Sequence, residues 1–344
     1  MEGIAEHIEK VIDAAQSAPS HQNAQPWRFA VEGDTISFSI DHERDPSPDG
    51  TMARIALGAA LECTTLSAAR MGATVRSQPP RNGALVTLSI EGPKRIPEPD
   101  LARLRRVTNR RVYDGRALDD ALLKKLKEAI PQGHWFGRTH VRALGPIFEQ
   151  AEELFFLDAN LRERAMNAIR FDVKDRESVD RGIAIGSLEL QAAERAALLT
   201  IRKPPTSGVN VASIKVLASR ARKLIESASG VLLITTASNE PMADVDVGRV
   251  MQRAWMTLTR EGLAVHPMTR IISLGLGPSA MGTENDLLPP LLQSFRKVFP
   301  MIPDGTRIAF LMRFGWAEAP TCRTARMPLS ESIATLDINA PPAR

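Results

Sequence analysis

The sequence is poor in cysteine and aromatic residues, and it has no long apolar run. Among 344 residues there are two cysteines, Cys63 and Cys322, too few for a disulfide framework or a zinc site. Aromatic residues make up 5% of the chain, so stacking platforms for single-stranded nucleic acid are scarce. No apolar stretch is long enough to cross a bilayer, and the N-terminus lacks the basic and apolar regions of a signal peptide. We therefore expect a cytoplasmic protein without membrane contact.

The charge balance is mildly basic, with a formal net charge of +4 and a pI near 9.3. Such a balance is compatible with phosphate-bearing ligands but is weak evidence for nucleic-acid binding. The basic residues are spread widely, apart from a dense cluster at Arg103–Arg111. No spacing of histidine, cysteine or carboxylate residues matches a metal site. We expect a small-molecule partner, no nucleic acid and no metal.

A polar, proline-containing segment, Ser17–Trp27, follows an expected helix at Ile4–Gln16 and precedes an expected strand at Trp27–Val31. Prolines favour extended conformations in the residues before them, so the segment is predicted to be a loop. Side chains of Ser20, Asn23 and Gln25 offer donors and acceptors to a planar polar ligand. The alternative is an ordinary polar turn capped by a buried tryptophan.

A second pattern is Arg106-x-Thr108-x-Arg110, in the basic cluster. Alternate residues of an extended segment project to one side. Two guanidinium groups flanking a hydroxyl would suit a phosphate monoester, because arginine offers several planar N–H donors. The alternative is a solvated basic face.

Two long helices rich in small and apolar residues are expected at Met52–Met71 and Val245–Glu261. Leu57-Gly58-Ala59 in the first aligns with Val247-Gly248-Arg249 in the second, and each helix ends at a glycine followed by a strand-like segment. Helices of this composition must be buried. They could pack together at the centre of a pseudo-two-fold structure, or the similarity could arise by chance between two alanine-rich helices.

Further along the chain we expect a short strand at His140–Leu144 and a long helix at Pro146–Arg170. The segment Arg202–Ser213 is predicted to be a loop and is a candidate lid. Gly275–Ala280 matches a loose Gly-x-Gly-x-x-Gly/Ala pattern, but its internal proline and basic surroundings argue against a dinucleotide-binding fold. A structural glycine turn is the preferred interpretation.

In combination these motifs resemble the FMN-dependent nitroreductase family. The order Pro-Ser-x-x-Asn-x-Gln-Pro-Trp within Ser17–Trp27 is similar to the family's flavin-contacting loop, and Arg106-x-Thr108-x-Arg110 is similar to its phosphate-binding motif. The tail Arg323–Leu329 resembles the family's terminal Arg-x-Pro-Leu. Asp246–Met268 resembles its central helix and the loop that reaches the flavin ring.

The resemblance implies an α+β, nitroreductase-like fold with antiparallel-dominated sheets packed by long central helices. The loop precedes the arginines here, so we expect a tandem intramolecular pseudo-dimer of the Acg-like subgroup. Residues 1–95 would form the N-terminal half, which supplies the loop. Residues 100–344 would form the half with the phosphate clamp, including a divergent segment at 160–215 that could be a lid. One FMN per chain is expected, in a monomeric fused pseudo-dimer or a loose homodimer.

By the same resemblance, NADH or NADPH would transfer a hydride through FMN to an electron-poor acceptor such as a nitroaromatic compound or a quinone. The alternatives are an FMN-sequestering protein with a closed lid, and a flavin-dependent dehydrogenase or oxidase of a specific metabolite. His21 and His266 are weak candidates for a proton donor. The resemblance implies these cofactor-binding residues: Arg106, Thr108, Arg110 and Arg326 for the phosphate, with Arg323 beside them in the tail; Ser20, Asn23 and Gln25 for the ring or ribityl chain, with Trp27 near the flavin; and backbone groups of Pro267, Met268 and Thr269 near the edge of the ring.

Overall fold

The computed structural model describes residues 4–45, 47, 49–81, 83–96, 98, 100–174, 177, 179–202, 210–276 and 286–333. The chain divides into two compact units, each considered by itself. Unit 1 comprises Met1–Arg105, Glu240–Met256 and Ala325–Arg344, and unit 2 comprises Arg106–Asn239 and Thr257–Thr324.

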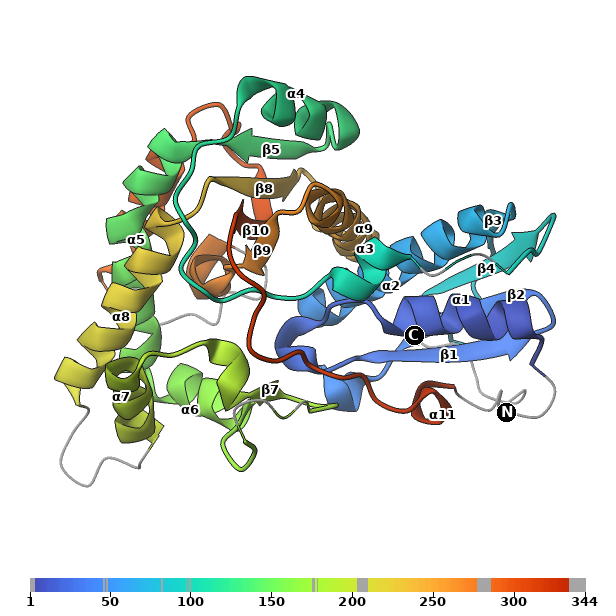
Figure 1. The fold of residues 1–344 in the computed structure, drawn as a ribbon, viewed down its shortest axis with the longest axis horizontal. Helices are drawn as coiled ribbons and strands as arrows, with labels where there is room; N and C mark the ends of the chain where they lie inside the picture. Colours follow the sequence, from blue (N-terminus) through green and yellow to red (C-terminus); the bar gives the residue numbers. More distant parts are fainter. Residues whose placement is uncertain are drawn as a thin grey trace. The chain divides into compact units, whose positions relative to one another are not determined.

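Unit 1 begins with helix α1, whose apolar side chains at helical spacing are buried. Glu6 and Glu9 lie in its first turn, where the helix dipole favours acidic residues. A four-stranded antiparallel sheet follows, in the order β1-β2-β4-β3 (Figure 1). The bounds of the elements are α1 (Glu6–Gln16), β1 (Trp27–Glu32), β2 (Thr35–Ile40), α2 (Thr51–Arg70), β3 (Thr74–Gln78), β4 (Val86–Glu91), α3 (Leu101–Arg105) and α11 (Leu329–Ser332). Helix α9 (Pro241–Arg260) contributes its residues up to Met256 to this unit.

Helices α2 and α9 cross at two glycines. A Cβ on Gly58 would lie 1.9 Å from the carbonyl oxygen of Val245, and a Cβ on Gly248 would lie 2.0 Å from that of Ile55. The backbones touch at this point, so only glycine fits. The predicted packing of the two glycine-containing helices is therefore confirmed.

Unit 2 contains a second four-stranded antiparallel sheet, in the order β5-β8-β10-β9. In each sheet the first two strands in the chain are neighbours, and the last two pair in reverse order. The bounds are α4 (Asp120–Ala129), β5 (Gly133–Phe136), α5 (Arg138–Leu157), α6 (Ala159–Asn167), β6 (Ile169–Arg170), β7 (Ile183–Ala184), α7 (Ala192–Arg202), α8 (Val211–Glu226), β8 (Gly230–Thr236), β9 (Ala264–Pro267), α10 (Leu288–Lys297) and β10 (Arg307–Gly315).

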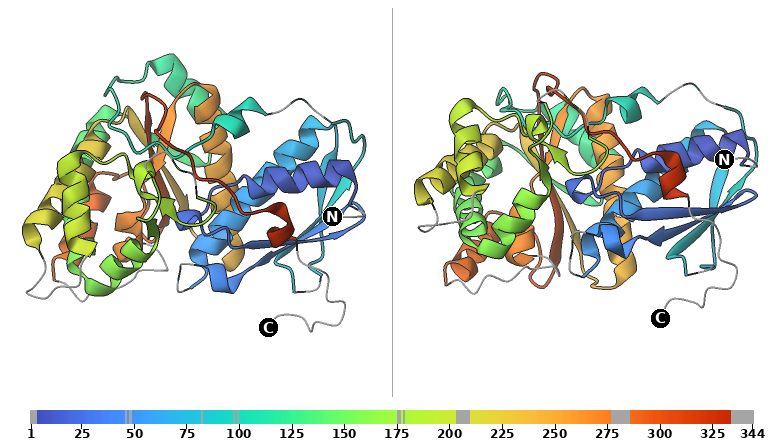
Figure 2. Two further views of the ribbon diagram at one scale, coloured as in Figure 1. Left: turned by 60° about the horizontal axis from the view of Figure 1, so that its bottom comes forward. Right: turned by 90° about the horizontal axis from the view of Figure 1, so that it is seen from below.

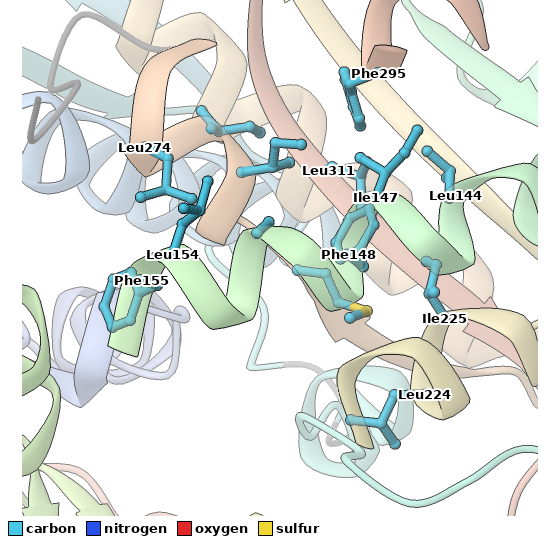
Figure 3. Packing of buried hydrophobic residues seen from close by; sticks show 14 of the residues in the cluster. Leu144, Ile147, Phe148, Leu154, Phe155, Leu224, Ile225, Leu274, Phe295 and Leu311 are labelled. Atoms are coloured by element: carbon cyan, nitrogen blue, oxygen red, sulfur yellow. The ribbon is translucent and has the colours of Figure 1, made fainter. Parts of the chain in front are cut away.

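Four helices lie between β5 and β8, where the first sheet has only a hairpin between β1 and β2. Figures 1 and 2 show α7 beside α8, and α8 against α5. Leu144, Phe148 and Leu154 on α5, with Leu224 and Ile225 on α8, belong to one buried apolar cluster (Figure 3). The insertion thus extends the core of unit 2 rather than forming a separate body.

The predicted α+β class with antiparallel-dominated sheets is confirmed, but two expected elements are wrong. His140–Leu144 is not a strand; it lies within α5, because Val141, Leu144 and Phe148 form one helix face, and the strand is Gly133–Phe136. The helix expected at Pro146–Arg170 is interrupted at Asp158, whose carboxylate accepts from the Leu161 N–H (2.8 Å) and begins a new helix.

Parts of other predictions lie outside the described residues. The lid candidate Arg202–Ser213 includes 203–209, and the glycine pattern Gly275–Ala280 includes 277–280, both outside the described ranges. The described part of 160–215 is helical at α6, α7 and the start of α8, with a short parallel pairing of β6 and β7.

Candidate functional site

The arginine motif lies in unit 2 as an extended segment beside strand β9. Thr108 forms a parallel bridge with Val265, and the Asn109 N–H donates to the Val265 carbonyl (2.9 Å). Asn109 also donates through its side chain to the Glu318 carbonyl (2.7 Å). Arg323 donates to the Arg106 carbonyl (3.2 Å). The structure thus brings the motif, β9 and the tail arginine of unit 2 together.

Arg110 has most of its donors available. Among the described residues its guanidinium makes one hydrogen bond, from Nη1 to the Ser187 carbonyl (3.2 Å). Burial, and then the nearby charge of Arg220, lower the pKa of Arg110 to about 10, which leaves it protonated at neutral pH. The Thr108 hydroxyl, half-buried, has no hydrogen-bond partner within the described ranges. This cationic face can therefore accept an anion.

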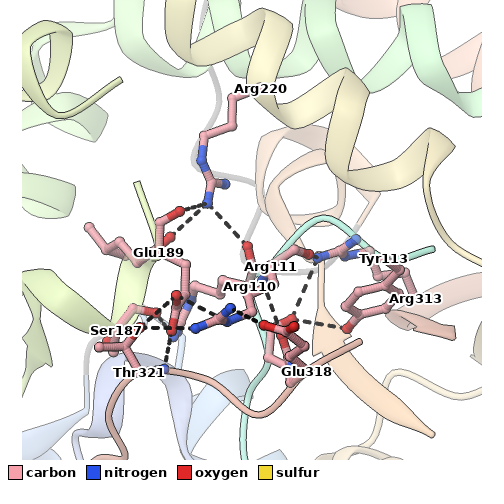
Figure 4. A network of polar contacts seen from close by, with 11 residues as sticks. Arg110, Arg111, Tyr113, Ser187, Glu189, Arg220, Arg313, Glu318 and Thr321 are labelled. Atoms are coloured by element: carbon pink, nitrogen blue, oxygen red, sulfur yellow. Dashed lines mark hydrogen bonds and ion pairs between the residues drawn. The ribbon is translucent and has the colours of Figure 1, made fainter. Parts of the chain in front are cut away.

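Arg313, on β10, contacts the motif segment (Figure 4). Its side chain is fully buried and stacks on the Tyr113 ring at 3.9 Å. It donates to the Arg111 carbonyl (2.6 Å) and the Leu224 carbonyl. Burial lowers the pKa of Arg313 to about 10, so the group remains a cation. The N–H groups of Arg313 already donate to acceptors within the protein, so the residue has a structural role.

Residues 185–189, the 3₁₀ turn Ile185–Leu188 and the following Glu189, come after β7 and are held against the motif by hydrogen bonds and an ion pair (Figure 4). Arg220 donates to the carbonyls of Leu188 (2.7 Å) and Arg110 (3.1 Å). The Glu189 carboxylate accepts from the Thr321 hydroxyl (2.9 Å) and pairs with Arg111 (3.3 Å). This described part of the expected lid region therefore contacts the motif directly.

His266, a candidate proton donor, is bound to Arg313. Its Nδ1 accepts from Arg313 Nε (3.2 Å), so the proton of the neutral ring is assigned to Nε2. Burial, followed by the charges of Arg313 and Arg110, lowers the pKa of His266 well below its usual value. The ring is neutral near pH 7, which makes it a poor acid.

The residues expected at the edge of the flavin ring, Pro267–Thr269, come directly after His266 in the chain. Pro267 pairs with Met312 in the sheet, and the Met268 N–H donates to the Leu311 carbonyl (3.0 Å). The Thr269 carbonyl accepts from the Ser273 N–H (2.9 Å). The backbone at 267–268 is thus largely committed to the sheet.

The second expected set lies in unit 1, in the Ser17–Trp27 loop. The Ser20 hydroxyl accepts from the Gln25 N–H (2.9 Å) and so closes the loop on itself. Gln25 is fully buried, and its side chain accepts from the Met327 N–H (2.9 Å). Asn23 accepts from Arg326 Nη1 (3.1 Å). The structure brings Ser20, Asn23, Gln25 and Arg326 together, with their polar groups directed largely at one another.

Trp27 and His21 occupy different environments. Trp27 is fully buried at the start of β1 and stacks on Phe29 with ring centroids 6.5 Å apart. Its Nε1 has no hydrogen-bond partner among the described residues. His21 is half-buried in a 3₁₀ turn. Trp27 thus packs as a core residue of unit 1.

Several residues of this network escaped the sequence analysis: Tyr113, Ser187, Glu189, Arg220, Arg313 and Gln16. One signal was available for Arg313, because it stands in the otherwise apolar run Leu311–Phe314, and a charge in a buried strand requires partners. Within the described ranges there is no group of three metal-ligating side chains, and no helix has the length and apolar content to span a membrane.

Comparison with known proteins gives one family model, described as the nitroreductase family, which matches residues 5–35. A curated relative, the uncharacterized protein MT1398 of Mycobacterium tuberculosis (strain CDC 1551 / Oshkosh), is 26% identical over 291 residues. That alignment covers 78% of this chain and 39% of the relative, so the chain spans about two fifths of the relative's length.

Among solved structures, the FMN- and NADPH-dependent nitroreductase NfnB from Sphigopyxis sp. strain HMH is 16% identical, with a TM-score of 0.40, covering 68% of this chain and 96% of that one. The nitroreductase with bound FMN from Bacteroides fragilis is 12% identical, with a TM-score of 0.36, covering 63% and 87%. The family-model match spans α1, the Ser17–Trp27 loop and β1, so this stretch of the α+β chain is similar to the nitroreductase family.

Proposed function

We propose that the chain is an FMN-binding oxidoreductase of the nitroreductase type. It would use NADH or NADPH as the hydride donor and reduce an electron-poor acceptor such as a nitroaromatic compound or a quinone. When bound, FMN supplies the redox chemistry by accepting the hydride and passing it on. The family match over residues 5–35 supports the class of protein, and the unused donors of Arg110 support the cofactor.

The observation that carries the proposal is the state of Arg110. Four of its five N–H groups have no acceptor in the described part of the protein, and the side chain is half-buried. A half-buried cation with unused donors is stabilised by an anion that can accept several hydrogen bonds. A phosphate monoester does so, and the Thr108 hydroxyl beside Arg110 would add one more bond. We assign Arg106, Thr108, Arg110 and Arg323 to the FMN phosphate.

The ring-side assignment comes from the sequence resemblance alone. It names Ser20 and Asn23 in unit 1 and the backbone of Pro267–Thr269 in unit 2. Gln25 and Trp27 are fully buried, so we place them in support of the loop rather than in contact with the ligand. Neutral His266 would orient Arg313 and not deliver a proton.

We further propose that the halves are tandem copies and that only one copy carries a flavin loop. Both sheets have the same strand order, and α2 and α9 occupy the same place in each, before the third strand. The connection between α1 and β1 contains Ser17–Pro26, but that between α4 and β5 contains only Ile130–Gln132. The second copy thus lacks the segment that the first uses, which supports one FMN per chain.

One observation favours the alternative of FMN sequestration. The Arg220 and Glu189 contacts hold the 185–189 segment against Arg110, so protein borders one side of the proposed phosphate site. A protein that stores FMN against such a segment would bind it without turnover. The reductase predicts that NADH or NADPH bleaches the flavin, and the storage protein predicts that it does not.

The test begins with the absorbance spectrum of the purified full chain, before and after incubation with FMN, followed by anaerobic addition of NADH or NADPH. We expect flavin bands that bleach. The double variant Arg106→Ala/Arg110→Ala should lose FMN while retaining its fold by circular dichroism, whereas the control Arg116→Ala, at an exposed arginine paired with Asp114, should retain FMN. Absence of flavin binding by the wild type would refute the proposal, and equal retention by the double variant would refute the clamp.

A further inference from the structure

The tail residue Arg326 binds the backbone carbonyl groups at the C-terminal end of helix α1. Its Nε donates to the Gln16 carbonyl (3.1 Å), and its Nη2 donates to the carbonyls of Ser17 (3.2 Å) and Ala18 (2.9 Å). Its Nη1 donates to Asn23 Oδ1 (3.1 Å) and to the Ala325 carbonyl (3.1 Å). A guanidinium has five N–H groups, and these five bonds use them all. The last carbonyls of a helix have no N–H partner within the helix, and here the guanidinium of Arg326 supplies the missing donors.

The loop held by Arg326 has an unusual backbone. Gln22, Asn23 and Gln25 all have positive φ angles, of 54°, 54° and 52°. Side-chain-bearing residues rarely adopt this region, and glutamine has no special tolerance for it. Such a conformation persists only when surrounding contacts impose it, and it clusters at functional sites.

The tail backbone supplies further contacts on the same loop. The Met327 N–H donates to Gln25 Oε1 (2.9 Å), and the Met327 carbonyl accepts from Gln16 Nε2 (2.5 Å). The Ala325 carbonyl accepts from Asn23 Nδ2 (3.3 Å). Gln16 and Gln25 are both buried, which protects these bonds from exchange with water. Three consecutive tail residues are therefore bonded to two of the three strained positions.

We propose that Arg326 and the backbone of Ala325–Met327 are positioning groups that impose the strained conformation of the Ser17–Trp27 loop. Arg326 acts through the loop and does not bind the cofactor phosphate, because its five N–H groups already donate to acceptors within the protein. The consequence for flavin rests on the proposed function, but the effect on the loop does not. The backbone conformation of this loop is thus set by residues about three hundred positions away in the sequence.

The first test is hydrogen exchange, followed by mass spectrometry, on the full chain without FMN. In Arg326→Ala we expect peptides covering 17–27 to exchange about tenfold or more faster, because several hydrogen bonds that hold the loop are lost. Peptides from α5 and α8 should be unchanged. The matched control is Arg323→Ala in the same tail, whose arginine donates to the Arg106 carbonyl; the loop peptides should keep their wild-type rate. Wild-type exchange of the loop in Arg326→Ala would overturn the proposal.

Two milder variants keep the test decisive if Arg326→Ala unfolds. Arg326→Lys keeps the positive charge but has three N–H donors in place of five. Gln16→Met removes the hydrogen bond to the Met327 carbonyl while nearly preserving the side-chain volume. Both should give intermediate acceleration in the loop peptides. Wild-type rates in both variants would overturn the proposal.

A second readout separates positioning from general stability. At saturating FMN, the visible circular dichroism of the bound flavin should differ between Arg326→Ala and the wild type, because the loop would meet the ring in a different shape. A faster-exchanging loop with an unchanged flavin spectrum would refute the link to flavin. If the wild type binds no FMN, the proposed function fails, and the exchange experiment still decides whether the tail holds the loop.

Discussion

Gly58 of α2 and Gly248 of α9 occupy equivalent positions in one helix crossing. Gly58 faces the carbonyl of Val245, three residues before Gly248, and Gly248 faces the carbonyl of Ile55, three residues before Gly58. This reciprocity is what a two-fold axis produces, and here it relates two segments of one chain. It supports the proposal that the halves descend from a duplicated unit.

Substitution at either glycine should therefore be severe. Gly58→Ala or Gly248→Ala would place a Cβ about 2 Å from a backbone oxygen, which cannot turn aside. We expect a loss of about 3 kcal/mol or more in the free energy of unfolding, measured by urea denaturation. Gly137→Ala, where a Cβ would meet nothing within 4 Å, is the control and should change stability by less than about 1 kcal/mol. A similar stability for all three variants would contradict the close crossing.

The contacts flanking the crossing differ between its two sides. Glu62 pairs with Arg253 (2.8 Å), and the equivalent contact on the other side joins Gln252 to Cys63 (3.1 Å). Glu62 is almost fully buried and also pairs with Arg249 (3.3 Å). One of the two equivalent contacts is thus charged and the other is neutral.

Removing the buried charge should be costly. Glu62→Gln leaves two arginines without their carboxylate, and because both arginine side chains are 39% exposed, we expect a loss of about 1 to 2 kcal/mol in unfolding free energy. Glu91→Gln, at an exposed pair with Arg76, should lose less than about 1 kcal/mol. Equal losses in the two variants, by urea denaturation, would show that burial of Glu62 adds nothing to the pair.

Much of this architecture could be predicted from sequence because its signals are local. The glycines at 58 and 248 stand in long apolar helices that end at glycine, and the strands at 231–236 and 307–314 are strongly apolar. The strand at Gly133–Phe136 was missed because it has only four residues, and its helical continuation shares its apolar content. Local pattern cannot separate two adjoining elements of similar composition.

The sites were harder to predict because their partners are distant. Residue type and motif order marked Arg110 and Arg326 alike as anion-binding arginines. Among the described residues, the structure distinguishes them by how many N–H groups already have acceptors: one at Arg110 and five at Arg326. Those acceptors are mainly backbone carbonyls, which every residue carries, so no side-chain pattern in the sequence identifies them.

Arg313 should be indispensable to unit 2. Arg313→Met keeps much of the apolar stem but leaves the carbonyls of Leu224 and Arg111 without their donor. We expect a loss of about 3 to 5 kcal/mol in unfolding free energy, because buried acceptors would be unsatisfied. The control is Arg116→Met, at an exposed arginine over the Trp316 ring, with an expected loss below about 1 kcal/mol. A tolerated Arg313→Met would mean that water replaces the lost donors.

His266 should make the protein sensitive to mild acid. Its folded-state pKa lies well below the unfolded value of 6.5, so the unfolded chain binds the proton more readily. Stability is therefore full above pH 6.5 and falls as the pH drops below it, by at most about 1.4 kcal/mol per pH unit. His266→Asn keeps an oxygen acceptor for Arg313 Nε but cannot take up a proton in this range. Urea denaturation from pH 7 to pH 5 should show a shallower loss of stability in the variant, because both proteins share every other titrating group. Parallel curves would mean that Arg313 and its neighbours do not suppress protonation of His266, and the ring would again be a candidate acid for the proposed reaction.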